Sequence, residues 1–286
     1  MSPGKVETLG VPVRANSRAL WLCAGLVSLG WLGLMWFLTT THWVSLNSAI
    51  SSIYIFFSRP EVDQVPVENL KPLGAPYAAA LTKLYQKEPQ KGTDGVMHKP
   101  MLGVGIKISE GMFMYDLARR VKARNTMEVG LASGYSPFFF LAATHANGGG
   151  THVAMDPFQN TDFYGVGLQA VRDAGLEHDF RFMEQYSQLA IPELVKEGKK
   201  FEVIFIDGDH RFDGTIIDFS LADLACAPGC YIVLHDRWMP SVQRVVSWIR
   251  KNRPDYQPEF SSQVPNLGVF RKVGEDKRQW THYVPF

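Results

Sequence analysis

The sequence has little of several features that would identify a specialised class of protein. It has only three cysteines in 286 residues, Cys23, Cys226 and Cys230, and their spacing matches neither a zinc site nor a disulfide framework. We therefore expect small buried side chains rather than a disulfide-built secreted fold. The formal net charge of +1 provides no general basic field, which argues against nucleic acid as a partner.

One long apolar run near the amino terminus, Ala19 to Leu38, contains no charged residue. About 20 helical residues span roughly 30 Å, the thickness of the hydrocarbon core of a bilayer. We therefore predict an N-terminal tail at residues 1–18 and a transmembrane helix at residues 19–38. A cleaved signal peptide is the alternative, but its apolar core would be shorter, and no convincing cleavage site follows this run.

The composition changes twice after this run. In residues 43–57, apolar side chains recur at helical spacing between serines, which predicts an interfacial helix or a short second span. Residues 59–76 contain four prolines and predict an extended linker, because proline blocks helix formation. We expect the linker to lead into one domain at residues 77–286, with no internal repeat.

That domain alternates helical and strand patterns, which predicts an α/β fold with a doubly wound parallel sheet. We expect Ser109 to be the N-cap of a helix that runs through Ala123, with Glu110 in the first turn, where the helix dipole favours an acid. The predicted strands are Thr126–Val129, His152–Met155, Phe180–Met183, Val203–Ile206 and Tyr231–Leu234. The other predicted helices are Tyr77–Glu88, Ser136–Ala146, Asp162–Ala174, Gln188–Glu197 and Asp213–Ala225.

Ligands of such sheets bind at the carboxyl ends of the strands, so these ends carry the candidate site. After the first strand comes MEVGLASGYS, in which Gly130 and Gly134 permit a tight turn and a close approach of main chain to a ligand. An ordinary structural turn explains this loop about as well. Its glycine spacing differs from GxGxxG, which argues against a nicotinamide-dependent reductase. After the second strand, Asp156 is placed to accept both hydroxyls of a ribose, although a lone strand-end Asp is often only solvated.

The run FEVIFIDGDHRFDG ends a strand in two acids and a histidine. Asp207 and Asp236 end two strands that this fold places side by side, and two carboxylates there can bind a divalent cation such as Mg²⁺. Neutral His210 can then accept a hydroxyl proton near physiological pH. The alternative is that GDH only caps the helix near Asp213.

These motifs together resemble the class I S-adenosylmethionine-dependent methyltransferases, most closely their small-molecule O-methyltransferase branch with catechol- and caffeoyl-CoA-type members. The resemblance covers roughly residues 99–251 and rests on MEVGLASGYS, AMDPF, VIFIDGDHRFDG and APGCYIVLHD. It implies a seven-stranded, mostly parallel, Rossmann-like sheet whose final hairpin is formed by Gln257–Ser262 and Gly268–Lys272. It also implies a set of S-adenosylmethionine contacts: Glu128, Gly130, Gly134, Tyr135, Ser136, Asp156, Ser187 and Asp207.

The sequence departs from the resembled branch at one pair of residues. Catechol-type members carry Asp-Asn after the fifth strand, whereas this chain carries His235-Asp236. We predict a metal site formed by Asp207, His235 and Asp236, with Asp207 and His210 as catalytic residues. As a ligand, His235 would make the site softer, so that it would also accept Mn²⁺, Fe²⁺ or Zn²⁺. Alternatively, His235 would be a second base in a mechanism without metal.

The function that we predict is membrane-anchored O-methyl transfer to a hydroxyl of a lipophilic small molecule. The alternative is a catalytically inactive methyltransferase-like subunit of a membrane complex. The expected partners are the substrate and the lipid bilayer, with a homodimer or a membrane-complex partner as further possibilities. Lys5, Arg14 and Arg18 predict a cytoplasmic amino terminus, which with one span would place the domain outside. We nevertheless expect a cytosolic domain, because the cofactor is cytosolic.

Overall fold

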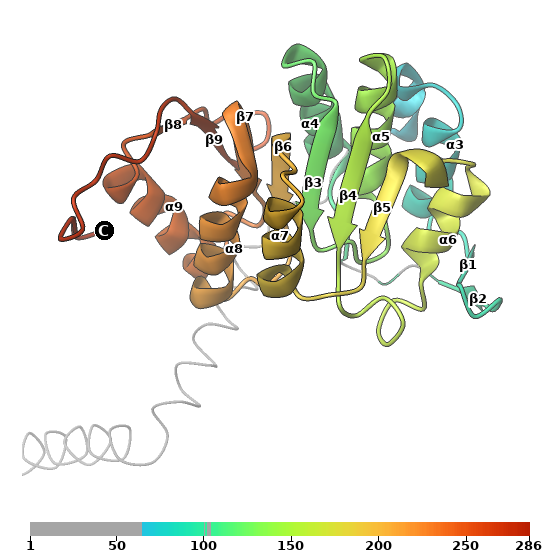
Figure 1. Ribbon diagram of the computed structural model, residues 1–286. Coiled ribbons are helices and arrows are strands. Elements are labelled where there is room, and N and C mark those ends of the chain that lie inside the picture. The colour runs from blue at the N-terminus through green and yellow to red at the C-terminus, as the bar shows by residue number, and fades with distance from the viewer. Residues whose placement is uncertain (1–64, 100, 102–103) are drawn as a thin grey trace, which may run out of the picture. The chain divides into compact units, whose positions relative to one another are not determined.

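The computed structural model describes residues 65–99, 101 and 104–286 (Figure 1). The predicted transmembrane helix at residues 19–38 and the segment at residues 43–57 lie outside these described residues. Within the part of the chain that the structure describes, no helix is both long enough and apolar enough to cross a membrane.

The centre of the domain is a seven-stranded sheet with the order β5-β4-β3-β6-β7-β9-β8. Its first five strands in this order pair in parallel, and β9 pairs antiparallel with both β7 and β8. The bounds are β3 Asn125–Val129, β4 Thr151–Met155, β5 Phe180–Met183, β6 Phe201–Ile206, β7 Cys226–Leu234, β8 Tyr256–Pro258 and β9 Gly268–Lys272. The predicted fold class and the predicted antiparallel final hairpin are confirmed.

Side chains of the central strands alternate between two cores, as the period of two in a strand requires. In β6, Val203 and Phe205 are buried in one core, while Ile204 and Ile206 are buried in the other. Both faces of the sheet are therefore covered, and for this reason the strands read as continuous apolar runs in the sequence.

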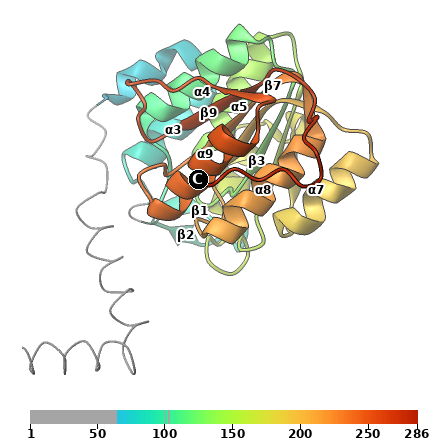
Figure 2. The same ribbon diagram turned by 90° about the vertical axis from the view of Figure 1, so that its left-hand side faces the viewer.

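The helices divide between these two faces, and Figure 2 shows them on either side of the sheet. One core includes buried residues of α3 (Tyr77–Tyr85), α4 (Ile108–Arg120), α5 (Ser136–Ala146) and α6 (Val166–Asp173). The other includes buried residues of α7 (Ser187–Lys196), α8 (Phe212–Ala225) and α9 (Pro240–Asn252). The helix predicted to have Ser109 as its N-cap begins at Ile108, and its N-cap is Lys107.

The prediction of an extended linker through residue 76 is wrong for residues 67–73. Val67–Leu73 form a 3₁₀ helix, η1, in which Leu70 and Leu73 are buried. This short helix packs against α3, α4 and α5. Burial of the two leucines offsets the helix-breaking tendency of Pro72, so the segment belongs to the domain core.

The structure also contains a small hairpin that we did not predict, formed by β1 (Gln90–Lys91) and β2 (Met97–His98). In Figure 1 it lies toward the edge of the sheet to which the carboxyl ends of β3 and β4 point. The His98 ring stacks on the Tyr164 ring with centroids 4.1 Å apart. The amide of Thr93 donates to the Tyr164 carbonyl at 3.0 Å. These contacts attach the hairpin to the loop that follows β4.

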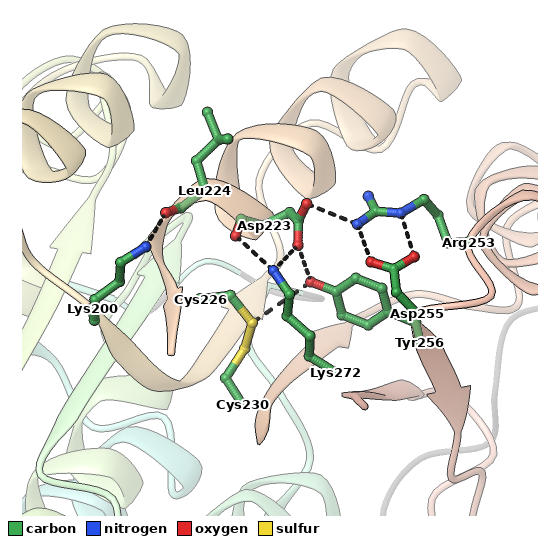
Figure 3. The surroundings of a disulfide bond; sticks show 9 residues. All are labelled: Lys200, Asp223, Leu224, Cys226, Cys230, Arg253, Asp255, Tyr256 and Lys272. Carbon is green, nitrogen blue, oxygen red and sulfur yellow. Dashed lines mark hydrogen bonds and ion pairs between the residues drawn. A yellow bond between two sulfur atoms is a disulfide. The ribbon is translucent and has the colours of Figure 1, made fainter. Parts of the chain in front are cut away.

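The prediction that no cysteines pair is also wrong. Cys226 and Cys230 form a disulfide around the Pro-Gly turn at the beginning of β7, with their Cα atoms 5.7 Å apart (Figure 3). The Tyr256 hydroxyl lies 3.6 Å from the Cys226 sulfur and donates to Asp223, which also pairs with Lys272. This network lies at the opposite end of β7 from the candidate site.

Candidate functional site

The carboxyl ends of β6 and β7 bring the three predicted metal ligands, Asp207, His235 and Asp236, together. Ile206 and Leu234 are paired in the sheet, so Asp207 and His235, the residues that follow them, lie side by side. The His235 amide donates to the Ile206 carbonyl at 3.0 Å, which extends the ladder by one residue. Asp236 then has a left-handed backbone with φ of 52°. This tight bend keeps its carboxylate close to the strand ends.

Asp207, His210 and Asp236 form a cluster that can hold a metal ion. Each offers one ligand atom, and the three atoms lie within 4.8 Å of one another. The His210 Nε2 is 3.3 Å from an Asp207 oxygen and 3.0 Å from an Asp236 oxygen. All three side chains are half-buried, which leaves one side of the cluster open to solvent. Two carboxylates and an imidazole suit a divalent transition metal or a magnesium ion with added waters.

His235, which we predicted as a metal ligand, has a different environment. Its Nδ1 lies 2.9 Å from Asp207, and its Nε2 lies 3.1 Å from Glu110 on α4. The Asn266 side-chain amide donates to Glu110 at 3.1 Å and to Asp236 at 3.3 Å. Both ring nitrogens of His235 are therefore engaged by carboxylates. The geometry favours His210 over His235 as the third ligand.

The same contacts set the charges of the two histidines. Burial alone would lower the pKa of His210, but Asp207 and Asp236 raise that pKa to about 10. Burial also acts against charge on His235, yet the Asp207 charge and the bonds to Asp207 and Glu110 raise its pKa well above the ordinary value. In the cluster without a metal ion this raised pKa favours the protonated form of His210, whereas the predicted proton acceptor is the neutral form. Metal binding would have to displace this proton, because imidazole coordinates metal only when it is deprotonated.

The pKa values of the two acids, Asp207 and Asp236, are lowered. Burial would raise the pKa of Asp207, but the charge on His235 and the bonds from both histidines outweigh it and lower that pKa. The pKa of Asp236 is lowered in the same way, because the bond from His210 and the charges of both histidines outweigh its burial. Both carboxylates are consequently ionised at neutral pH, as metal ligands must be.

The glycine loop lies directly against this cluster. Gly130 has φ of 92°, and a Cβ atom there would lie 2.3 Å from the Asp207 carbonyl oxygen. Gly134 has φ of 78°, and its Cβ would lie 2.4 Å from the Cα of Gly167 on α6. Both glycines are thus required by close approach of neighbouring main chain. The loop and the carboxylate cluster share one edge of the sheet.

Asp156 fastens the glycine loop from the end of β4. One carboxylate oxygen accepts the amides of Leu131 and Ala132 at 3.1 and 2.8 Å, together with the side-chain amide of Gln159 at 3.2 Å. The other oxygen accepts the Phe158 amide at 2.8 Å. The oxygen that accepts only the Phe158 amide, Oδ1, can accept a further hydrogen bond from a ligand.

The remaining predicted cofactor residues are buried, and their side chains have protein neighbours. The Glu128 carboxylate is fully buried, with one oxygen 3.2 Å from the Nε2 of His152. The Tyr135 hydroxyl donates to the Leu84 carbonyl, and the Ser187 hydroxyl donates to Asp218 on α8. Ser136 is buried in the first turn of α5. The hydroxyls of Tyr135 and Ser187 are thus engaged within the protein, whereas both Glu128 oxygens are buried without a hydrogen-bond partner.

Sequence reasoning missed three residues that touch the site: Glu110, Gln159 and Asn266. The acid in the first turn of α4 was visible, but nothing local indicated its partner, which lies 125 residues away in the chain. No local pattern singled out Asn266 or Gln159 as a site residue. Contacts over such separations follow from the sheet order rather than from local sequence.

Comparisons with known proteins agree with this geometry. Residues 127–237 match the methyltransferase domain model. The chain is similar to caffeoyl-CoA O-methyltransferase 3 of Nicotiana tabacum, with 31% identity over 134 residues, 45% of this chain and 54% of the relative. A similar enzyme of Populus trichocarpa is 30% identical over 45% of this chain and 53% of its own length. The chain thus spans just over half the length of these curated relatives.

Solved structures show the same fold. An O-methyltransferase of Bacillus cereus in complex with SAH superposes with a TM-score of 0.51 at 16% identity, over 79% of this chain and 97% of the other. The O-methyltransferase TomG of Streptomyces achromogenes, in complex with SAM, gives a TM-score of 0.52 at 18% identity, over 78% and 96% of the two chains. The fold is therefore that of these methyltransferases, and the predicted resemblance is confirmed at the level of the domain.

Proposed function

We propose that this chain is an S-adenosylmethionine-dependent O-methyltransferase that acts on a hydroxyl of a lipophilic small molecule. The observation that carries the proposal is the contact between the glycine loop and the carboxylate cluster, where Gly130 lies against the main chain of Asp207. A cofactor on the loop and a substrate hydroxyl at the cluster would thus meet at adjacent strand ends.

The reaction moves a methyl group from the sulfonium sulfur to the hydroxyl oxygen. The sulfur keeps the electron pair of the broken bond and becomes a thioether, and the hydroxyl proton leaves. A divalent cation bound by Asp207, His210 and Asp236 would lower the pKa of the substrate hydroxyl. The protein residues hold the oxygen in line with the methyl group, and much of the rate enhancement would come from this orientation.

His210 and His235 have separate duties in this proposal. His210 coordinates the cation through Nε2 when the cation is bound, so it then does not accept the substrate's proton through that atom. Without the cation, His210 carries a proton and accepts the substrate's proton only after losing its own. His235 orients Asp207 through one ring nitrogen, while Glu110 holds the other. Glu110 and Asn266 therefore support the cluster from behind.

Cofactor binding is assigned to the neighbouring strand ends. Asp156 would accept ribose hydroxyls through its less engaged oxygen. The main chain of Gly130, Gly134 and Ser136 would border the methionine part, because the first turn of α5 presents free amides and a positive dipole end. The segment containing Ser187 would lie by the adenine.

The substrate class rests on two features outside the described fold. The apolar run at residues 19–38 predicts an anchor, which favours acceptors that partition into membranes. The curated relatives are named for caffeoyl-CoA, which favours a phenolic hydroxyl. A membrane-bound phenol satisfies both features. An inactive subunit of a membrane complex is the rival that the experiment must exclude.

The test is methyl transfer by the full chain in detergent, using radiolabelled S-adenosylmethionine and hydroxylated acceptors, with Mg²⁺ and again with EDTA. We expect labelled phenolic products with metal and a large loss of turnover in EDTA. Asp207→Asn should lower turnover by a factor on the order of 10² or more, because it removes a ligand and a charge at the reacting oxygen. Binding of S-adenosylhomocysteine should change by only a few fold.

Asp209→Asn is the matched control, because Asp209 follows the same strand but pairs with Arg211. It should retain turnover close to that of the wild type. Full activity in Asp207→Asn would contradict the catalytic assignment. Cofactor binding without transfer to any acceptor, including extracted lipids, would favour the inactive subunit.

A further inference from the structure

Gln159 links the candidate cofactor loop to the hairpin at the same edge of the sheet. Its side chain is fully buried although it lies in a loop, four residues beyond the end of β4. We infer that Gln159 is a positioning residue that holds the glycine loop in its cofactor-binding shape. The inference rests on the proposed function, because it assigns a role in binding S-adenosylmethionine.

The contacts of the side-chain amide carry this inference. The Nε2 of Gln159 donates to the Ala132 carbonyl at 2.8 Å and to the Asp156 carboxylate at 3.2 Å. Asp156 in turn accepts the Ala132 amide at 2.8 Å. The peptide groups on both sides of Ala132 are therefore fixed by two neighbouring side chains, and one amide group joins them.

Ala132 needs such restraint because its backbone is unfavourable. It has φ of 48°, a left-handed conformation that a residue with a Cβ rarely adopts. A residue in this region persists only when its surroundings hold it there. Without the Gln159 donor, we expect the loop between Gly130 and Gly134 to relax toward other shapes.

The orientation of the amide shows that its donor is the functional part. The Oε1 of Gln159 is buried and has no hydrogen-bond partner. Rotating the amide by half a turn would place Oε1 against the Ala132 carbonyl and the Asp156 carboxylate, two acceptors, so that orientation is unfavourable. The side chain thus serves the loop while its own acceptor is unpaired, a poor arrangement for stability alone.

The main chain of Gln159 extends the link toward the hairpin. Its carbonyl accepts the Gly165 amide at 2.8 Å, and the preceding Tyr164 carbonyl accepts the Thr93 amide at 3.0 Å. The Tyr164 ring stacks on His98. One continuous set of contacts therefore runs from the β1–β2 hairpin through Gln159 to the glycine loop.

Two variants of the full chain test the inference. Gln159→Leu removes both the donor and the unpaired acceptor while keeping a similar volume. We expect the Kd for S-adenosylhomocysteine, measured by calorimetry, to rise about tenfold. The KM for S-adenosylmethionine should rise in parallel, kcat at saturation should stay within about twofold, and the unfolding temperature without ligand should not fall.

Gln159→Glu keeps the shape but places a carboxylate where the donor was. We expect a larger loss of affinity at pH 8 than for Gln159→Leu, and partial recovery at pH 5.5, where a protonated carboxyl can donate again. The affinity of the wild-type protein is measured at both pH values, so that effects of other titrating groups on binding can be subtracted. The unfolding temperature of Gln159→Glu is measured at both pH values. Recovery of affinity without a matching rise in unfolding temperature separates the positioning role from a structural one.

The control is Gln169→Leu, in which the lost amide donates to Asp173 and accepts from Arg172, both on the same helix. It should bind the cofactor product like the wild type. Wild-type affinity in both Gln159 variants, or a loss that follows the unfolding temperature with no pH recovery, would overturn the inference alone. Absence of binding by the wild type would instead overturn the proposed function, and the inference with it.

Discussion

Asp218 is a buried carboxyl whose environment disfavours its charge. It is 1% exposed, and its hydrogen-bond donor is the Ser187 hydroxyl. Burial raises its pKa to about 6, and the nearby charge of Asp209 acts in the same direction, while the Ser187 bond opposes the rise. At neutral pH the folded protein therefore contains a poorly compensated buried negative charge.

This shift predicts a pH-dependent contribution to stability. The folded state holds the proton more tightly than the unfolded state, so the contribution is fully present below pH of about 4 and is lost as the pH rises through about 6. Because the shift is about two units, the loss is on the order of 3 kcal/mol. Asp218→Asn removes the titration, so we expect it to be more stable than the wild type at pH 7.5.

Urea unfolding of both proteins between pH 4 and 8 measures this difference. The other paired carboxylates titrate in both proteins, so the difference in unfolding free energy isolates Asp218. It should approach zero near pH 4 and grow toward pH 7. A difference that is constant across this range would contradict the raised pKa.

At this scale, the sequence could predict residues whose chemistry is local. Asp156 and Asp207 were visible because each directly follows an apolar strand, and Asp236 because it lies two residues beyond one. The roles of the histidines were not visible, because they depend on partners distant in the chain. His235 appeared to be a ligand until the structure placed Glu110 on its second nitrogen. The charge of His210 likewise follows from two flanking acids rather than from its neighbours in sequence.

Among the elements, the 3₁₀ helix η1 shows where sequence patterns were misleading. Prolines predicted an extended chain, but Leu70 is fully buried beneath the first helices of the domain. Leu70→Ala should therefore destabilise the domain by about 2–5 kcal/mol, the usual cost of truncating a buried leucine. An extended linker would tolerate the same change without measurable loss.

Glu68→Ala is the control within the same element, because Glu68 is exposed. Chemical unfolding of the full chain in detergent, followed by tryptophan fluorescence, compares the two variants with the wild type. We expect only Leu70→Ala to shift the midpoint. Equal midpoints would mean that η1 contributes nothing to the fold.

The remaining elements differ in whether their own residues carry a sequence signal. The parallel strands and their helices were predictable because each carries its own apolar period and its own Gly or Pro stop. The β1–β2 hairpin was not, since strands of two residues have no period to detect. The Cys226–Cys230 pair escaped because a short spacing with an odd cysteine total gave no framework.

For the whole molecule, the last prediction concerns the side of the membrane on which the domain would lie if residues 19–38 form the predicted anchor. Three basic residues before the apolar run, Lys5, Arg14 and Arg18, favour a cytoplasmic amino terminus. One span would then place the domain on the far side, away from cytosolic S-adenosylmethionine. The domain would instead lie in the cytosol if residues 43–57 cross the membrane a second time. It would also lie there if three basic residues are too few to set the orientation of the first span.

We predict the cytosolic side, because the S-adenosylmethionine that we propose as the ligand of the glycine loop and Asp156 is made there. In sealed vesicles whose cytosolic face is outward, added protease should digest the domain, with or without detergent. Protection that is lost only when detergent opens the vesicles would place the domain in the lumen. The enzyme would then need a separate supply of its methyl donor, and the inactive subunit would become the better account of the chain.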